Sequence, residues 1–332
     1  MIPSDSSQSN LVCDSSLPLV SIVTPSYNQG QFIRQTIDSV LSQDYPNIEY
    51  WVIDGGSTDN TMAILQDYHH DRRLRWVSEP DRGQADAVNR GWKLCQGEIL
   101  GWLNSDDVYL EQAISRQVQA LLAHPQVGVV YGDAILTDES DQVIGRYHTR
   151  PFDRTRFLHV SSIPQPTAFL RRSLIEQYGG LDLQWHYALD FELFLRLMWH
   201  TDFLYTGYEV ATYRFHTSSK TVSHYDRMLA ETIAVVEQIC DAHPQELPHV
   251  RSKAVSDWYW MGVMNSLEAG NYAQGLTYAQ AALRMALLRP RMAMVSLKLI
   301  DHIFHLQLSD MVISWLDRFS QYRSKASAAK GK

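Results

Sequence analysis

Two acidic turns, about fifty residues apart, each follow an apolar run typical of a β-strand. The first turn, Asp54–Asp59, follows Tyr50–Ile53, and the second, Asn104–Asp107, follows Ile99–Leu103. In open α/β sheets ligands bind beyond the carboxyl ends of the strands, so both turns can face one crevice. Carboxylates that gather there without counter-charges suit a divalent cation and a phosphate-bearing ligand.

Each turn alone also has an ordinary structural interpretation. Gly55 and Gly56 let the backbone approach a ligand, and Asp54 can accept hydrogen bonds from a base or a ribose. The same residues are common turn chemistry that caps a helix. Asp106 and Asp107 repel each other and need solvent, a cation or a donor network, but Asp106 could also cap the next helix. Together, at matching strand ends, the two turns favour a ligand site.

The elements that must position these turns alternate between strand and helix. Strands are expected at 20–24, 50–54, 75–77 and 99–103, and helical spacing of apolar residues occurs at 33–41, 62–65 and 85–95. This alternation predicts an α/β fold with a mostly parallel sheet and helices on both faces. After residue 125 the expected elements are strands at 127–131 and 143–147, a loop at 162–167, a helix from about Ala188 and only helices from about Tyr225.

The helical end of the chain contains a predicted hairpin over 258–290. Its segment 269–283 resembles the middle of one tetratricopeptide repeat, with Pro290 near the expected end. A stable array needs about three such units, so packing against the main domain is favoured over a partner-binding groove.

Composition bounds the class of protein. The chain has 332 residues, 45% of them hydrophobic, enough for one large domain and an appendage. A net charge of −8 argues against a nucleic-acid partner. Three dispersed cysteines indicate a reducing cytoplasm, and residues 1–17 predict a disordered Ser-rich tail rather than a signal peptide. No apolar stretch reaches the roughly 18 residues of a membrane span.

Nine segments, in order along residues 19–220, resemble family 2 inverting glycosyltransferases of the GT-A fold. They are Val20–Asn28, Val52–Asp59, Glu79–Gly83, Asp86–Gly91, Leu103–Asp107, Ile163–Thr167, Gly179–Asp182, Leu189–Leu193 and Tyr213–His216. The resemblance covers about two thirds of the chain. It implies that 18–125 binds the nucleotide sugar and 126–224 binds the acceptor, before a helical region at 225–332.

The resemblance also implies roles for individual residues on the donor side. Tyr27, beside the Pro25 backbone, would line the base pocket, and Asp54 would bind the base or ribose. The segment that closes over the donor would contain Asp81, Arg82 and Asp86, with Arg82 facing the diphosphate. The remaining donor-side residues are Asn104 and Ser105.

The same comparison implies a metal site for Mn²⁺ or Mg²⁺. Asp106 corresponds to the metal ligand of the family's acidic motif, and His216 to a position that reaches the metal or the diphosphate in part of the family. Asp107 would lie behind them. Asn104 departs from the family pattern, because a carboxylate usually stands there; its amide can still bind a ribose hydroxyl, but one negative charge is lost.

Asp190 aligns with the family's catalytic base, which takes the proton of the attacking acceptor hydroxyl. Glu192 is about 200° further around the helix, so both cannot face one acceptor, and we expect it to stabilise the helix. On the acceptor side, Gln165 and Trp185 are expected to border the pocket.

The predicted function is therefore metal-assisted transfer of a sugar, with inversion, from a nucleotide-sugar donor to a hydroxyl of a glycan or lipid-linked acceptor, as in polysaccharide biosynthesis. UDP is the family's usual carrier. The alternatives are a sugar nucleotidyltransferase and a non-catalytic scaffold that presents the helical repeat. Residues 271–332 contain nine bases and three acids. They could form an ordinary solvated face, or rest peripherally on the inner face of an anionic membrane; a homo-oligomer is also left open.

Overall fold

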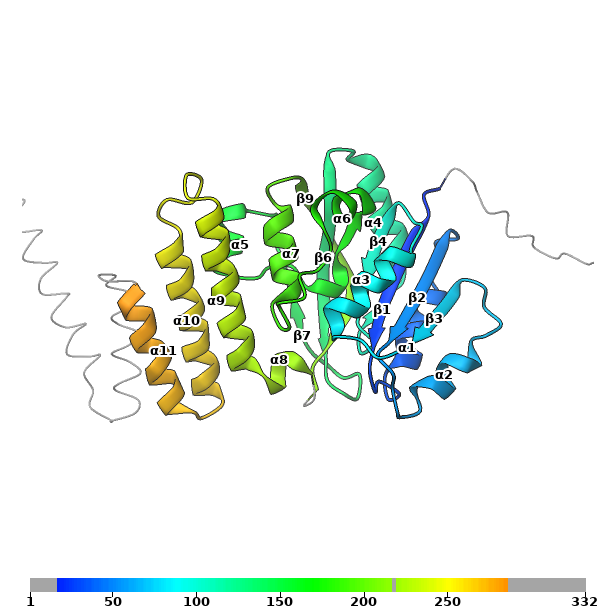
Figure 1. The fold of residues 1–332 in the computed structure, drawn as a ribbon, viewed down its shortest axis with the longest axis horizontal. Coiled ribbons are helices and arrows are strands. Elements are labelled where there is room, and N and C mark those ends of the chain that lie inside the picture. Colours follow the sequence, from blue (N-terminus) through cyan, green and yellow to red (C-terminus); the bar gives the residue numbers. More distant parts are fainter. Residues whose placement is uncertain (1–16, 217–218, 286–332) are drawn as a thin grey trace, which may run out of the picture. The chain divides into compact units, whose positions relative to one another are not determined.

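The computed structural model describes residues 17–216 and 219–285, apart from the side chains of residues 221 and 222. The chain divides into two compact units, Met1–Val235 and Val236–Lys332 (Figure 1). The division falls inside helix α9, Tyr225–Ala242, about ten residues after the predicted start of the helical region.

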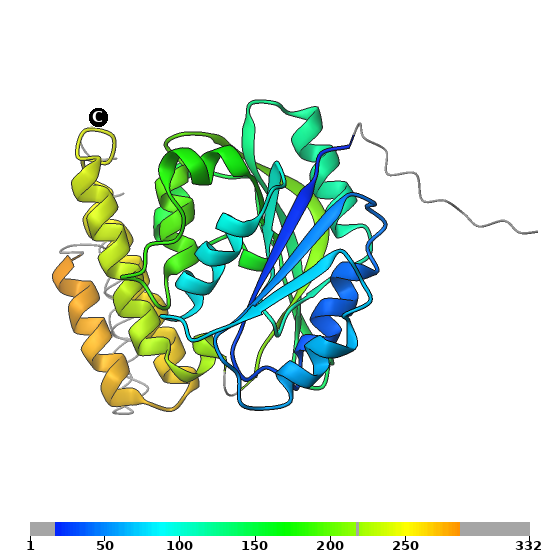
Figure 2. The same cartoon turned by 45° about the vertical axis from the view of Figure 1, so that its right-hand side comes forward.

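The first unit begins with the predicted alternation of strands and helices. The elements are β1 Val20–Ser26, α1 Ile33–Leu41, β2 Ile48–Asp54, α2 Thr61–Asp67, β3 Leu74–Ser78, α3 Gln84–Leu94 and β4 Ile99–Trp102. The strands pair in the order β3-β2-β1-β4, and all three pairings are parallel. The sequence prediction of an α/β sheet with helices on both faces is confirmed (Figure 2).

The rest of the sheet is mixed, so the expectation of a mostly parallel sheet holds only for the first four strands. The later elements are β5 Val108–Tyr109, α4 Ala113–Ala123, β6 Val127–Thr137, β7 Val143–Tyr147, α5 Arg154–His159, the 3-10 turn η1 Gln165–Thr167, β8 Phe169–Arg171, α6 Arg172–Tyr178, α7 Leu189–Leu197, β9 Asp202–Arg214 and α8 Lys220–Ser223. β8 lies antiparallel between β4 and β6, and β9 pairs parallel with β6 but antiparallel with β5. Parallel neighbours need a crossover connection, usually a helix. The regular strand–helix alternation ends after β4, so the later strands also pair antiparallel.

Burial on the two faces of the sheet follows the alternation of side chains along each strand. On one face Val20 and Ile22 of β1 join a core cluster with residues of α1, α2 and α4. On the other face α3 packs closely against the sheet, because Gly91 leaves room for the side chain of Val23: a Cβ at Gly91 would lie 2.4 Å from it. The two packed faces fix the carboxyl ends of β1 to β4 at one edge.

The second unit is helical. After the last part of α9 it contains α10, Arg251–Glu268, and α11, Tyr272–Met285, which pack as the predicted hairpin. Ser256 on α10 donates a hydrogen bond to the Ala282 carbonyl at 3.1 Å. Pro290 and most of the basic segment 271–332 lie outside the described residues. Within the part of the chain that is described, no helix has both the length and the apolarity needed to cross a bilayer.

Candidate active site

The register of the parallel strands brings the predicted site loops to one edge. Ser26 at the end of β1 pairs with Asp54 at the end of β2, and Asp54 pairs with Ser78 at the end of β3. β4 ends at Trp102, whose partner on β1 is Val23. The loops that begin at residues 27, 55, 79 and 103 therefore leave the sheet side by side.

Asp54 is fully buried and is held by its own turn. Its Oδ2 accepts hydrogen bonds from the Ser57 amide at 2.8 Å, the Gly56 amide at 3.1 Å and the Ser78 hydroxyl at 2.7 Å. Its Oδ1 accepts a short hydrogen bond from the Ser57 hydroxyl. The carboxylate thus shapes the turn, and burial among donors suits its charge.

The turn after Asp54 leaves space that Asp81 occupies. A Cβ at Gly55 would lie only 2.8 Å from Asp81 Oδ2, so the glycine lets this carboxylate approach the backbone. Asp81 Oδ1 accepts from the Gly83 amide at 2.7 Å. Next to it, Arg82 is largely exposed and pairs with Asp86 at 3.0 Å, which lowers the pKa of Asp86.

The loop after β1 is tied to the loop after β2. Asn28, with a φ of 53°, accepts a hydrogen bond from the Thr58 amide at 2.9 Å, and its own amide donates to the Ser57 hydroxyl at 2.7 Å. Tyr27 is left 60% exposed beside this tie, following Pro25 and Ser26 at the end of β1. An exposed aromatic ring on a fixed loop can stack against a planar base.

Asn104 is the centre of a hydrogen-bond network. Its Oδ1 accepts from the Trp102 indole at 2.9 Å and from Gln84 Nε2 at 2.7 Å. Its Nδ2 donates to Asp107 Oδ2 at 3.2 Å and to Gln165 Oε1 at 3.0 Å, and Gln165 in turn donates to the Trp102 carbonyl at 2.6 Å. The amide is thereby fully engaged with protein groups, and so is Gln165, which was expected on the acceptor side.

Asp106 and His216 meet at the end of this turn. His216 Nε2 lies 3.0 Å from Asp106 Oδ2, and the imidazole packs against the Phe32 ring at 4.8 Å between centroids. Ser105, by contrast, is buried, and its carbonyl accepts from the Thr36 hydroxyl at 2.9 Å. Asp107 is buried as well, and burial together with the charge of Asp106 raises its pKa.

Asp106 and His216 could supply two of the ligands of a metal site. Within the described residues no cluster of three or more His, Cys, Asp or Glu side chains could hold an ion by itself. One carboxylate and one imidazole at 3.0 Å fit an ion that takes its remaining oxygens from a diphosphate and water. Mg²⁺ prefers oxygen ligands, so the imidazole favours Mn²⁺.

Arg214, a residue not singled out from the sequence, locks the acidic turn. Its backbone amide donates to Asp107 Oδ1 at 3.0 Å and its Nε to the Asp106 carbonyl at 2.8 Å. The other guanidinium nitrogens bind Gln35 at 2.8 Å and Asp141 at 2.6 Å. The side chain is 1% exposed. Arg214 thus ties the end of β9, two residues before His216, to the turn that contains Asp106.

Asp190 lies in the first turn of α7, and burial raises its pKa. The start of α7 is fixed from α9: Glu231 Oε2 accepts from the amides of His186 at 2.9 Å, Tyr187 at 2.7 Å and Ala188 at 3.1 Å. Glu192 is turned away into an ion pair with Arg196 at 2.8 Å. Arg196 also donates to carbonyls of the preceding 178–180 loop, so this pair braces the helix.

Lys220 connects the two halves of the site. Its Nζ donates to Gln84 Oε1 at 2.8 Å and to the His186 carbonyl at 3.2 Å. Burial lowers the pKa of Lys220, and the charges of Glu231, Asp106, Asp190 and Asp81 oppose that shift. Three of the predicted site carboxylates therefore act electrostatically on one ammonium group.

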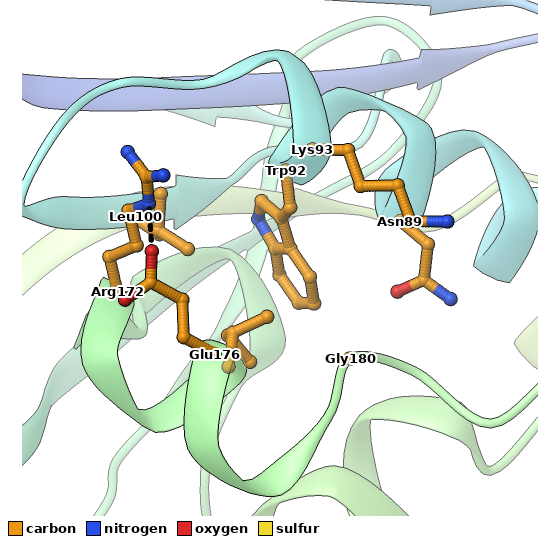
Figure 3. Close-up of a pocket in the computed structure, with 8 residues that line it drawn as sticks. Asn89, Trp92, Lys93, Leu100, Arg172, Glu176 and Gly180 are labelled. Carbon is orange, nitrogen blue, oxygen red and sulfur yellow. Dashed lines mark ion pairs between the residues drawn. The ribbon is translucent and has the colours of Figure 1, made fainter.

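A cavity of about 480 Å³ lies elsewhere, between α3, β4 and α6 (Figure 3). Trp92 and Lys93 point to it from α3, opposite the Arg172–Glu176 ion pair. None of the predicted site residues lines it. Trp185, expected near the acceptor, is half-buried, and its indole nitrogen has no hydrogen-bond partner within the described residues.

Sequence comparison assigns the chain to a family of enzymes. The model of glycosyl transferase family 2 matches residues 21–179. An uncharacterized glycosyltransferase of Mycobacterium tuberculosis is 34% identical over 187 residues, which cover 54% of this chain and 69% of the relative. The chain belongs to glycosyl transferase family 2, and the protein is a glycosyltransferase.

Solved structures share the fold at low sequence identity. The 1–349 fragment of S. aureus TarS in complex with UDP-GlcNAc superposes with a TM-score of 0.55 at 15% identity, covering 80% of this chain and 92% of that one. The mannosyltransferase PcManGT from Pyrobaculum calidifontis, in complex with GDP-Man and Mn²⁺, gives a TM-score of 0.52 at 22% identity, covering 88% and 89%. The GT-A-like fold predicted from the sequence is confirmed.

Several residues that shape the site were not identified from the sequence. They are Gln84, Trp102, Arg214, Lys220 and Glu231. Arg214 lies inside the Tyr213–His216 segment that was already matched to the family, so its place two residues before His216 was an available signal. Glu231 offered none, because it is one acid among several on an amphipathic helix.

Proposed function

We propose that the protein transfers a sugar, with inversion, from a nucleotide-sugar donor to a hydroxyl of a glycan or lipid-linked acceptor. The observation that carries this proposal is the register of β1 to β4, which brings the loops with Asp81 and Asp106 to one edge of the sheet; the charges of Asp81, Asp106 and Asp190, which all act on Lys220, support a single site for the three carboxylates. UDP is proposed as the carrier because the S. aureus TarS fragment of the same fold was solved with UDP-GlcNAc.

The donor would lie across the edge formed by β1 to β4. Tyr27 is exposed where a base could stack, and Asp81 lies above Gly55 where it can accept from a base or ribose. Asp54 and Asn104 fix the turns after β2 and β4 that form this edge of the sheet. Asp86 steadies the exposed Arg82, which would reach the diphosphate from outside.

Asp106 and His216 would hold a divalent cation together with the diphosphate oxygens. Such an ion, when bound, offsets negative charge that develops on the leaving nucleoside diphosphate. Mn²⁺ is proposed because of the imidazole, and PcManGT, which has the same fold, was solved with Mn²⁺.

Asp190 would take the proton of the acceptor hydroxyl as its oxygen attacks the anomeric carbon from the side opposite the diphosphate. Burial raises its pKa, and a more basic carboxylate is a better proton acceptor at neutral pH. This direct attack, with departure of the diphosphate, is a single displacement that inverts the anomeric carbon and forms no covalent sugar intermediate on the protein. Trp185 would border the acceptor on the same loop that leads to α7.

The test is donor turnover by the purified protein. Nucleotide sugars are offered with Mn²⁺, with Mg²⁺ and with a chelator, and release of nucleoside diphosphate is measured for the wild type and for Asp190→Asn. We expect release by the wild type only, with donor affinity retained in the variant. Release of pyrophosphate instead, or turnover of no sugar nucleotide, would contradict the proposal. A cytoplasmic enzyme that works at the membrane surface fits this chemistry, and flotation with liposomes tests the second half of that statement.

A further inference from the structure

Lys220 is a cation that lies among acidic side chains of the site and makes no ion pair with the residues that the structure describes. Its two hydrogen-bond acceptors there are neutral oxygens, Gln84 Oε1 and the His186 carbonyl. Other basic side chains near the site are already paired: Arg82 with Asp86, and Arg214 with Asp141. His216 is paired with Asp106.

The charge around Lys220 is strongly negative. Asp81, Asp106, Asp190 and Glu231 all act on it, although none is bonded to it. A nucleotide sugar that enters such a site brings further negative charge on its diphosphate, and like charges at short range repel one another. One divalent ion on Asp106 and His216, with Arg82 already paired to Asp86, would not balance both the carboxylates and the diphosphate, so a further cation of the protein is favoured there.

The neutral partners make Lys220 available at little cost. An ammonium that left a carboxylate would leave an unpaired negative charge behind, whereas Lys220 leaves only two neutral acceptors and gains an anionic one. Gln84 is the first residue of α3, directly after the loop that contains Asp81 and Arg82. His186 lies four residues before Asp190. Lys220 is therefore held between the donor-side loop that leads to α3 and the loop that leads to Asp190 on α7.

We propose that Lys220 binds the diphosphate of the donor and, during transfer, neutralises charge on the departing nucleoside diphosphate. This inference rests on the proposed function and adds a residue to it. Lys220 would exchange its hydrogen bonds to Gln84 and the His186 carbonyl for one to a phosphate oxygen of the donor, which lies between the loop after β3 and the loop before α7.

The test compares ligands that differ only in phosphate. Binding of uridine, UMP and UDP with Mn²⁺ is measured by calorimetry for the wild type, Lys220→Met, Lys220→Arg and the control Lys93→Met. Lys93 is an exposed lysine on α3 that faces the separate cavity, so its loss removes the same charge elsewhere (Figure 3). Thermal unfolding of each variant shows whether it is folded.

We expect Lys220→Met to bind UDP roughly 10- to 100-fold more weakly, the range for loss of a hydrogen bond to a charged group. Uridine affinity should be unchanged, Lys220→Arg should retain most of the UDP affinity, and Lys93→Met should match the wild type. Equal losses for uridine and UDP would instead mean that Lys220 only supports the loops. That result, or unchanged UDP affinity, would overturn the inference.

Two further results distinguish this inference from another role of Lys220 and from a failure of the proposed function. If Lys220→Met left UDP affinity intact but moved the acid limb of the pH–rate profile upward, the ammonium would serve Asp190 rather than the diphosphate. If the wild type bound no nucleoside diphosphate of any base and turned over no sugar nucleotide, the proposed function itself would fall, and this inference with it.

Discussion

Replacing Arg214 with methionine should loosen the acidic turn without leaving a void. The guanidinium has three hydrogen-bond partners: the Asp106 carbonyl at 2.8 Å, Gln35 at 2.8 Å and Asp141 at 2.6 Å. A hydrogen bond to a charged group contributes about 1.5–3 kcal/mol, so the gross loss is about 4.5–9 kcal/mol. Gln35 is exposed and Asp141 is 47% exposed, so water replaces two of the three bonds. Relief of the desolvation of a buried cation offsets more of the loss.

The net destabilisation is therefore expected at about 2–4 kcal/mol, concentrated at residues 104–107. Methionine retains the apolar contact with Phe32, over which the guanidinium lies at 4.8 Å. Hydrogen exchange of peptides that cover the acidic turn measures the local opening, and a titration of activity with Mn²⁺ measures the consequence. Because Asp106 and His216 would no longer be held together, half-maximal activity should require at least about tenfold more Mn²⁺.

Arg146→Met provides the matched control. Arg146 pairs with Glu209 at 2.7 Å on the surface of β7, where its side chain is 51% exposed and Glu209 is 37% exposed. Exposed pairs contribute about 0–1 kcal/mol, so neither exchange at the acidic turn nor the Mn²⁺ dependence should change. If Arg214→Met behaved like this control, the assignment of Arg214 as the lock of the turn would be wrong.

The remaining predictions concern Asp190, Asn104 and Glu231. Asp190 has a pKa raised above 3.8 by burial, so the rate should fall as pH drops through that raised pKa, and a profile flat across weakly acidic pH would argue against its role as base. Because its pKa is raised, the folded state binds the proton of Asp190 more tightly than the unfolded state does. The contribution of Asp190 to stability is therefore present at low pH and is lost as pH rises. Asp190→Asn should raise the melting temperature at neutral pH but not in acid, which calorimetry at both pH values would measure. Asn104→Asp should destabilise the protein by about 2–4 kcal/mol in urea unfolding rather than tighten the metal, because it removes two donors and adds a charge beside buried Asp107. Glu231→Gln should lower turnover without weakening UDP binding, since it weakens the cap on α7 and removes a negative charge that acts on Lys220; equal loss of both would place Glu231 on the donor side.

How far the sequence predicts this site depends on the range of the contacts involved. The turns after β2 and β4 follow from local strand and turn patterns, and the parallel register then brings them together without further information. Strand β9 was not predicted, because Asp202–Arg214 mixes polar and apolar residues and is defined by its pairing with β6. Arg214 meets Asp106 across 108 positions of sequence, so only the folded sheet reveals the contact.

The position of Asn104 shows how such distant contacts change the meaning of a motif. From the sequence alone, Asn104 stands where the family usually has its first carboxylate, so one negative charge is missing. In the fold its amide donates to Asp107 and Gln165 and accepts from Trp102 and Gln84, and a carboxylate could not make the two donations. A second carboxylate there would also face Asp107, whose pKa is already raised by burial and by the charge of Asp106. The asparagine therefore belongs to the architecture of the turn, and the negative charge available to a cation is concentrated on Asp106, next to His216.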